Sequence, residues 1–185
     1  MNDTSKPEAS NVSIRLWNEG DLSLLERLMG DPAMMEYLGG PETPEQIRNR
    51  HERYTRIKDT GKGVMFVILA GDNQTPAGSI GYWEHDANGE MAWETGWSVL
   101  PEFQGQGIAT SAIPLMLDHA HADGRYRFVH AFPSVENGPS NAICRKAGFT
   151  LEGAFDFEYP PGHPMRCNDW SYDLFGEDQK EDGRE

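Results

Sequence analysis

One short segment has the glycines and the position of an anion-binding loop. It reads Gln104-Gly105-Gln106-Gly107-Ile108-Ala109-Thr110 and stands between a strand-like run and an apolar-periodic run that predicts a helix. Glycines let the backbone approach a ligand because no Cβ stands in the way. The first N–H groups of a helix have no partner inside it, so they attract an anion such as a pyrophosphate. The missing third glycine at position 110 and the absence of a following Gly-Lys-Ser/Thr exclude the common dinucleotide and P-loop motifs.

A second group of polar residues shares one side of a helix predicted over residues 138–147. They are three and four positions apart in the sequence: Asn137, Ser140, Asn141 and Cys144. Pro139 stands just inside the predicted start, so Asn137 has the place of a helix N-cap. The Asn137 side chain can cap the helix and contact a ligand at the same time, so the sequence is compatible with both roles.

The strand predicted over residues 91–100 carries a candidate general base. Alternation divides its side chains between two faces, Met91, Trp93, Trp97 and Val99 on one and Glu94, Gly96 and Ser98 on the other. A carboxylate inside an apolar strand is costly unless it has a partner or a task, and burial raises its pKa. Glu94 is therefore the leading candidate, and a structural pairing with an arginine or with tryptophan nitrogens is the alternative. Glu84, His85 and Glu158 are secondary candidates, His85 acting through a water.

The elements that must position these residues follow from periodicity and turn signals. The predicted strands cover residues 12–17, 64–70, 78–84, 91–100, 127–132, 149–157 and 170–175, and the predicted helices residues 22–29, 43–59, 107–122 and 138–147. Thr43-Pro44-Glu45-Gln46 is typical of a capped helix start, and the helix that follows is so polar that we expect it to lie exposed. Pro114 predicts a kink or a late start for its helix. This order predicts a mixed α/β sheet with helices on both faces.

Composition narrows the class of protein. The chain has 185 residues, which suits one domain over residues 11–175, with a loose segment 1–10 and an acidic, disordered tail 176–185. A net charge of −14 disfavours nucleic acid and anionic membranes as partners and favours cationic ones. Only two cysteines occur, Cys144 and Cys167, and no signal peptide or membrane span is visible, so we expect a cytoplasmic protein. No group of residues has metal-ligand spacing, so no metal is expected.

Two motifs carry a resemblance to a known family. The loop Gln-x-x-Gly-x-Ala after Val-Leu-Pro-Glu, and the stretch from Asn137 to Phe149, resemble the GNAT superfamily of N-acetyltransferases, in particular the branch of ribosomal-protein N-terminal acetyltransferases and their small-molecule relatives. The resemblance implies the GNAT fold, a mixed α+β architecture with a central, mostly antiparallel sheet and helices on both faces. It also implies acetyl-CoA as co-substrate and direct transfer of the acetyl group to a primary amine.

The same resemblance implies roles for individual residues. An unpaired backbone N–H near Val99 and Leu100 would stabilise the oxyanion, the loop from Gln104 to Thr110 would hold the pyrophosphate, and Asn137 would bond the pantetheine arm. Many relatives carry a tyrosine acid where this chain has Cys144. The acid is then Ser140, Cys144 or solvent, and Cys144 also fits a plain apolar filler.

The acceptor is expected to be a small-molecule amine or a peptide N-terminus. The acidic charge favours a small cationic amine, while the branch resemblance favours a protein N-terminus. A non-catalytic acyl-CoA-binding sensor or interaction module is the alternative function, because the tyrosine is missing at Cys144. Relatives are often dimers, so a homodimer is a further expectation.

Overall fold

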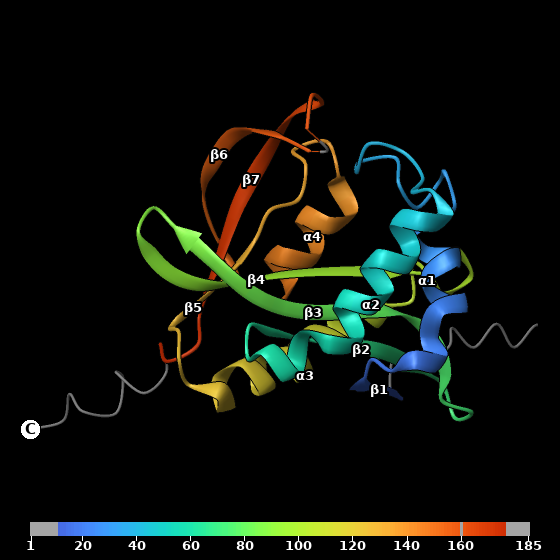
Figure 1. Ribbon diagram of the computed structural model, residues 1–185. Helices are drawn as coiled ribbons and strands as arrows, with labels where there is room; N and C mark the ends of the chain where they lie inside the picture. Colours follow the sequence, from blue (N-terminus) through green and yellow to red (C-terminus); the bar gives the residue numbers. More distant parts are fainter. Residues whose placement is uncertain (1–10, 160, 177–185) are drawn as a thin grey trace, which may run out of the picture.

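The computed structural model describes residues 11–159 and 161–176 (Figure 1). The predicted loose segment 1–10 and residues 177–185 of the predicted tail lie outside the described residues. The strands are β1 (Val12–Leu16), β2 (Gly63–Ala70), β3 (Thr75–Ala87), β4 (Glu90–Val99), β5 (Phe128–Ala131), β6 (Thr150–Glu158) and β7 (Pro164–Asp173). The helices are α1 (Leu22–Met29), α2 (Pro44–Thr60), α3 (Ile108–Asp123) and α4 (Gly138–Lys146), with short 3-10 turns at Glu19–Asp21 and Pro101–Phe103.

One mixed sheet organises the molecule. Its strands follow the order β1-β2-β3-β4-β5-β7-β6. β4 and β5 run parallel, whereas the other neighbouring strands run antiparallel. The predicted fold, a mostly antiparallel sheet within a mixed α/β architecture, is confirmed.

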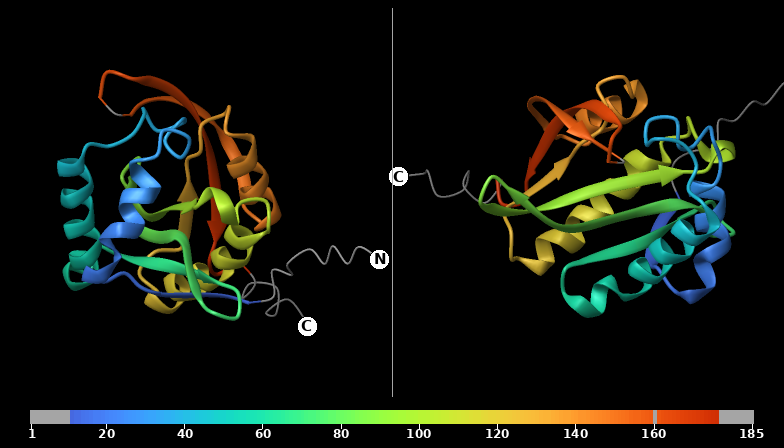
Figure 2. Two further views of the ribbon diagram at one scale, coloured as in Figure 1. Left: turned by 90° about the vertical axis from the view of Figure 1, so that its right-hand side faces the viewer. Right: turned by 45° about the horizontal axis from the view of Figure 1, so that its top comes forward.

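Helices cover both faces of the sheet because successive side chains of its strands point to opposite sides. On β2, Phe66 and Ile68 enter the core cluster beneath α3 and α4, while Met65 and Val67 enter the cluster beneath α1 and α2. The left view of Figure 2 shows the sheet between these two pairs of helices. Each helix thus buries one apolar side and leaves the other to solvent.

The sheet divides between its two parallel strands. β4 and β5 pair over only three positions, from Trp93↔Val129 to Thr95↔Ala131, and β4 then continues to Val99 without β5 beside it. The hairpin of β6 and β7 rises away from the end of β4 (Figure 1). The backbone of β4 therefore opens toward the space between the two parts of the sheet.

The structure corrects or completes three expectations about the elements. β7 begins at Pro164 and not near Trp170, because pairing with β6, rather than an apolar run, makes its first residues extended. α3 begins at Ile108 despite Pro114, so its start is not delayed. The polar helix α2 has the predicted capping box of Thr43 and Gln46 and is mostly exposed, as predicted; one of its sides also borders a cavity.

Candidate active site

A cavity of about 2240 Å³ lies on the α1–α2 side of the sheet and enters the split between β4 and β5. Single-ligand pockets are usually on the order of 300–1,000 Å³, so two substrates fit in this space. The sequence-predicted residues that line it are Glu84, His85, Glu94, Ser98, Val99, Gln104, Gly105, Ala109, Asn137 and Ser140. The cavity therefore brings the glycine loop, the β4 carboxylate and the start of α4 together.

The glycine loop has backbone conformations that only glycine adopts without strain. Gly105 has φ 73° and Gly107 has φ 74°, and a Cβ built on Gly105 meets nothing within 4 Å. Gly107 is the N-cap of α3 and supplies no side-chain oxygen to cap the helix. The N–H of Ser111 donates the first helical hydrogen bond, to Gly107 O at 3.0 Å. The preceding N–H groups, those of residues 108–110, are thus available to an anion.

Other residues of the predicted cofactor loop have a structural position. Gln104 Nε2 donates to Val99 O at 2.9 Å, and Gln106 Nε2 donates to Glu102 O at 3.0 Å, so both side chains tie the loop to the end of β4. Leu100 and Ile108 are buried in the two core clusters. These two residues offer backbone groups to a ligand, and their side chains anchor the loop.

The N–H of Val99 points into the split of the sheet. Leu100 N–H donates to Ala77 O of β3, at 2.8 Å. Successive N–H groups of a strand point to opposite edges, so the N–H of Val99 is directed away from β3. Because β5 has ended its pairing at Thr95, this donor faces the cavity that Val99 lines.

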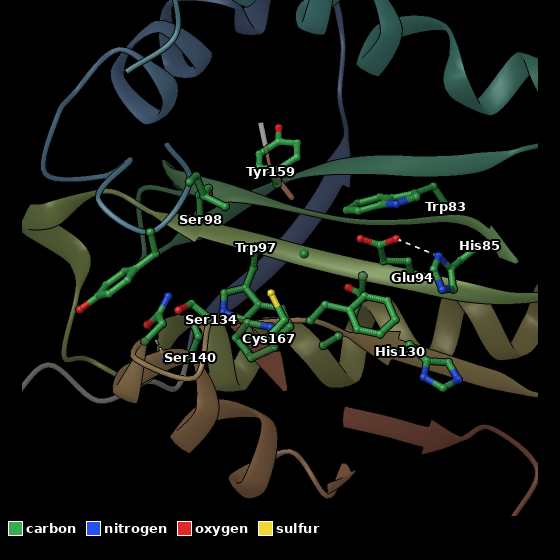
Figure 3. A pocket seen from close by; sticks show the side chains of 18 of the residues that line it. Trp83, His85, Glu94, Trp97, Ser98, His130, Ser134, Ser140, Tyr159 and Cys167 are labelled. Carbon is green, nitrogen blue, oxygen red and sulfur yellow. Dashed lines mark hydrogen bonds and ion pairs between the residues drawn. The ribbon is translucent and has the colours of Figure 1, made fainter. Parts of the chain in front are cut away.

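The start of α4 presents two of the predicted residues to the cavity. Asn137 Oδ1 accepts a hydrogen bond from Ser140 N–H at 3.2 Å and so caps the helix. Both residues line the cavity, and Figure 3 shows Ser140 at its edge. Buried Ser134, which sequence reasoning passed over, lines it as well.

Asn141 and Cys144, on the same predicted side of α4, point into the protein. Asn141 donates to Ser134 O and Asn137 O, and its Oδ1 accepts hydrogen bonds from the side chains of Asn168 and Trp170 at 2.8 Å each. Its amide therefore joins α4 to β7.

Cys144 is fully buried in the core between α4 and the sheet. Burial raises the pKa of its thiol to about 12. The thiol does not line the cavity, so this position gives it no route to a substrate there. Its surroundings are those of a small apolar residue.

Glu94 lies half-buried on the cavity face of β4, as alternation predicts. Its Oε2 is 3.3 Å from His85 Nδ1 on β3. Figure 3 shows the carboxylate in the pocket next to Trp83, with the contact to His85 dashed. Burial raises the pKa of the Glu94 carboxyl, and the neighbouring histidines and Trp83 only partly oppose this. The raised pKa makes this carboxylate a stronger base than that of an ordinary glutamate.

A second histidine–carboxylate pair lies beside Glu94. His130 stands opposite Glu94 in the β4–β5 register, and its Nδ1 is 2.7 Å from Asp169 Oδ1 on β7. Sequence reasoning missed this pair because its two members are far apart in the chain. Of the secondary candidates, Glu84 is held by Tyr126 and Arg125.

Glu158, the remaining secondary candidate, accepts a weak 3.4 Å bond from the N–H of Gly162 in its own hairpin. It is exposed and not part of the cavity lining. Its side chain therefore does not share the cavity with Glu94.

Arg50 of α2 closes one side of the cavity. Its guanidinium pairs with Glu42 and donates to the hydroxyls of Tyr54 and, at 3.2 Å, Tyr159 in the β6–β7 hairpin. The Arg50 and Glu42 side chains are only 17% and 13% exposed. A helix predicted to lie exposed therefore contacts the hairpin across the cavity.

Metal ligands and membrane-spanning helices also bear on the kind of site. Among residues 11–159 and 161–176, no group of three or more histidine, cysteine, aspartate or glutamate side chains is placed to hold a metal ion. Within the same residues, no helix has the length and apolar character needed to cross a membrane.

Comparisons with known proteins agree with this geometry. The family model described as an acetyltransferase (GNAT) domain matches residues 11–150. The chain is 28% identical over 159 residues to the uncharacterized N-acetyltransferase YnaD of Bacillus subtilis, covering 85% of this chain and 86% of that protein.

Solved structures have the same fold. An acetyltransferase from Salmonella typhimurium that modifies the N-terminal serine of ribosomal protein L7/L12 has a TM-score of 0.75 at 23% identity, covering 89% of this chain and 95% of that one. Spermidine N-acetyltransferase from Vibrio cholerae, in complex with CoA and spermine, has a TM-score of 0.73 at 21% identity, covering 89% and 96%. The family model spans most of the chain, and the chain therefore belongs to the GNAT family of acetyltransferases.

Proposed function

We propose that this protein transfers the acetyl group of acetyl-CoA directly to a primary amine. One observation carries the proposal: an anion-binding helix start and a half-buried carboxylate with a raised pKa open into the same cavity. The first supports binding of the cofactor's pyrophosphate, and the second supports removal of a proton from the amine. CoA is also bound by the spermidine N-acetyltransferase of the same fold.

The cofactor fits the residues on the loop side of the cavity. N–H groups from Gln104 to Thr110 would hold the pyrophosphate, helped by the left-handed conformations of Gly105 and Gly107. Asn137 at the start of α4 would contact the pantetheine arm. When bound, acetyl-CoA supplies an acetyl thioester, which is reactive toward an amine nucleophile.

Three groups of this chain then serve the transfer. Glu94 accepts a proton from the ammonium so that the amine nitrogen can form a bond to the acetyl carbon. Val99 N–H donates to the acetyl oxygen while it carries negative charge. The carbon–sulfur bond breaks as the amide forms; Ser140 delivers a proton to the leaving thiolate and regains one from the acylated nitrogen.

The acceptor favoured by the site is a small cationic amine. Glu94 and Asp169 place two carboxylates in the acceptor part of the cavity, where they attract an ammonium. The bond between Arg50 and Tyr159 narrows the access that a protein N-terminus would need. The related fold serves both kinds of acceptor, since one neighbour modifies a ribosomal protein and another is a spermidine N-acetyltransferase.

The first test is thiol release from acetyl-CoA over a panel of monoamines, polyamines, aminoglycosides and short peptides, with the variant Glu94→Gln beside the wild type. A base must be deprotonated, so wild-type kcat/KM should rise with pH through a pKa above the ordinary value for glutamate. The variant should lose this rise and at least about 100-fold in kcat, the usual contribution of a general base.

Glu84→Gln is the matched control, because Glu84 lines the same cavity but is bonded to Tyr126 and Arg125. It should keep the pH rise. A raised pKa in the folded state also means that stability is lost as pH rises through that pKa, so Glu94→Gln should raise the Tm above it. Wild-type pH dependence in Glu94→Gln would remove Glu94 from the role of base.

A further inference from the structure

An apolar surface faces the acceptor part of the cavity. We call it the aromatic wall; it consists of Phe132, Phe155, Phe157 and Tyr159, all of which line the cavity. Phe157 is 48% exposed, although it is a large apolar side chain. Apolar surface left open inside a cavity favours an occupant that is itself apolar.

A bulge in β6 brings the wall to this face. The register with β7 shifts by one residue between Leu151 and Gly153. A shift of one residue exchanges the two faces of a strand. Phe155 and Phe157 therefore pair with Cys167 and Met165, which also line the cavity.

The wall begins next to Glu94. The His85 ring that contacts Glu94 lies 5.0 Å from the ring of Phe132. From Phe132 the rings follow one another at centroid distances of 5.5 Å to Phe155, 6.2 Å to Phe157 and 6.5 Å to Tyr159. These spacings are those of contacting aromatic rings, so the surface is continuous from the carboxylate outward.

The two ends of the wall differ in charge. At the near end stand the carboxylates of Glu94 and Asp169. At the far end the guanidinium of Arg50 bonds the hydroxyl of Tyr159, and Arg53 of the same helix lines the cavity. A ligand along the wall thus meets the carboxylates first, then aromatic surface, then the guanidinium of Arg50, whose charge is already paired with Glu42.

From this arrangement we propose that the acceptor is an arylalkyl primary amine, with one ammonium at Glu94 and an aromatic ring on Phe155 and Phe157. The inference rests on the proposed function and names its substrate class. A polyamine of similar length suits the wall less well, because its second ammonium would lose water against apolar rings, and the nearby carboxylate of Glu42 is already paired with Arg50. An arylalkyl amine has a single ammonium, which matches the carboxylate of Glu94, and a flat apolar ring, which matches the aromatic wall.

The test compares kcat/KM for 2-phenylethylamine, n-propylamine and 1,4-diaminobutane. Burial of a phenyl ring should favour 2-phenylethylamine over the other two by about tenfold or more. Phe157→Ala and Phe155→Ala should each lower kcat/KM for 2-phenylethylamine by about tenfold. Turnover of n-propylamine and the KM of acetyl-CoA should change by no more than about twofold, because neither needs the wall.

Leu151→Ala is the matched control. Leu151 is an apolar residue of the same strand, 49% exposed, that does not line the cavity. Its kinetics should equal those of the wild type. A preference for 1,4-diaminobutane, or the same loss in Phe157→Ala for every amine, would overturn the inference while leaving the proposed function standing.

Binding measured without turnover separates the two proposals. Trp83 and Trp97 line the cavity, so quenching of their fluorescence by 2-phenylethylamine in the presence of CoA reports occupancy. If no amine is acetylated, yet 2-phenylethylamine binds the wild type and not Phe157→Ala, the proposed function fails and the binding site stands. If 2-phenylethylamine does not bind the wild type, the inference is overturned.

Discussion

Ser140 and Cys144 lie one helical turn apart on α4 and have opposite surroundings. Ser140 borders the cavity next to the cap residue Asn137, whereas Cys144 is enclosed in the core. A proton donor must reach the leaving thiolate, and its pKa must suit that transfer. Burial raises the pKa of Cys144 to about 12, so we leave this residue out of the proposed chemistry.

Two substitutions separate these residues in the assay. Ser140→Ala should lower kcat by about 100-fold while leaving the Tm within a degree or two, because the residue is only partly buried. Cys144→Ala should keep kcat and lower the Tm, because it removes a packed sulfur atom from the core. Steady-state rates and thermal melts of both variants check this. A large loss of kcat in Cys144→Ala that Cys144→Ser restores would return the cysteine to the mechanism.

At the scale of elements, the start of α3 depends on the identity of one residue, the glycine at position 107. The helix begins at a glycine with φ 74°, and Gly105 and Ala109 on either side of it line the cavity. The same helix ends at Gly124, which has φ 73° and lies outside the cavity. One helix therefore has two left-handed glycines, of which only the first borders the proposed cofactor site.

Gly107→Ala and Gly124→Ala form a matched pair. A left-handed residue with a side chain costs about 1–2 kcal/mol, so each variant should lose a similar part of its stability. Only Gly107→Ala should also lower the affinity for acetyl-CoA, by about tenfold or more, because its Cβ and any shift of the helix start alter the proposed anion site. Calorimetric titration with acetyl-CoA and thermal melts measure the two effects. Equal affinities in the two variants would sink the assignment of the loop.

At the scale of the whole molecule, the interactions of Arg50 join parts of the chain that are distant in sequence. Arg50 links α2 to Glu42 before it and to Tyr159 in the β6–β7 hairpin. The described contacts place the cavity between these parts and the sheet. The shape of the acceptor site thus depends on this interaction as well as on the sheet.

Arg50→Met should be destabilising, because it leaves the carboxylate of Glu42 nearly buried without its partner. The expected loss is about 2 kcal/mol, or about 4–8 °C in Tm for a domain of this size. Arg56→Met is the control, since Arg56 and its partner Glu52 are 71% and 59% exposed and such surface pairs contribute little. Thermal melts at neutral pH check this. Similar melting temperatures for the two variants would show that the interactions of Arg50 do not stabilise the fold.

Local signals made much of the fold and part of the site predictable. The glycine loop, the capping box of α2 and the cap of α4 depend on residues within a few positions of one another. The alternation of β4 likewise depends only on the period of a strand, and it correctly assigned Glu94 and Ser98 to one face and Trp93 to the other. Such patterns are readable in a sequence because their physical causes are local.

Pairing between distant segments decided which side chains of β6 face the cavity. The bulge that turns Phe155 and Phe157 toward the cavity exists only in the register with β7. Continued alternation from the buried Phe149 would have assigned both rings to the core side.

By itself, the sequence determined the family, the order of elements and the glycine loop proposed to bind the cofactor's pyrophosphate, because these follow from local composition and spacing. The tertiary structure alone decided which polar groups meet: His130 with Asp169, Arg50 with Tyr159, and the inward direction of Asn141 and Cys144. The physical reason is that burial and hydrogen-bond partners depend on segments brought together from far apart in the chain. The helix and strand periods of the sequence carry no information about which distant segments come together.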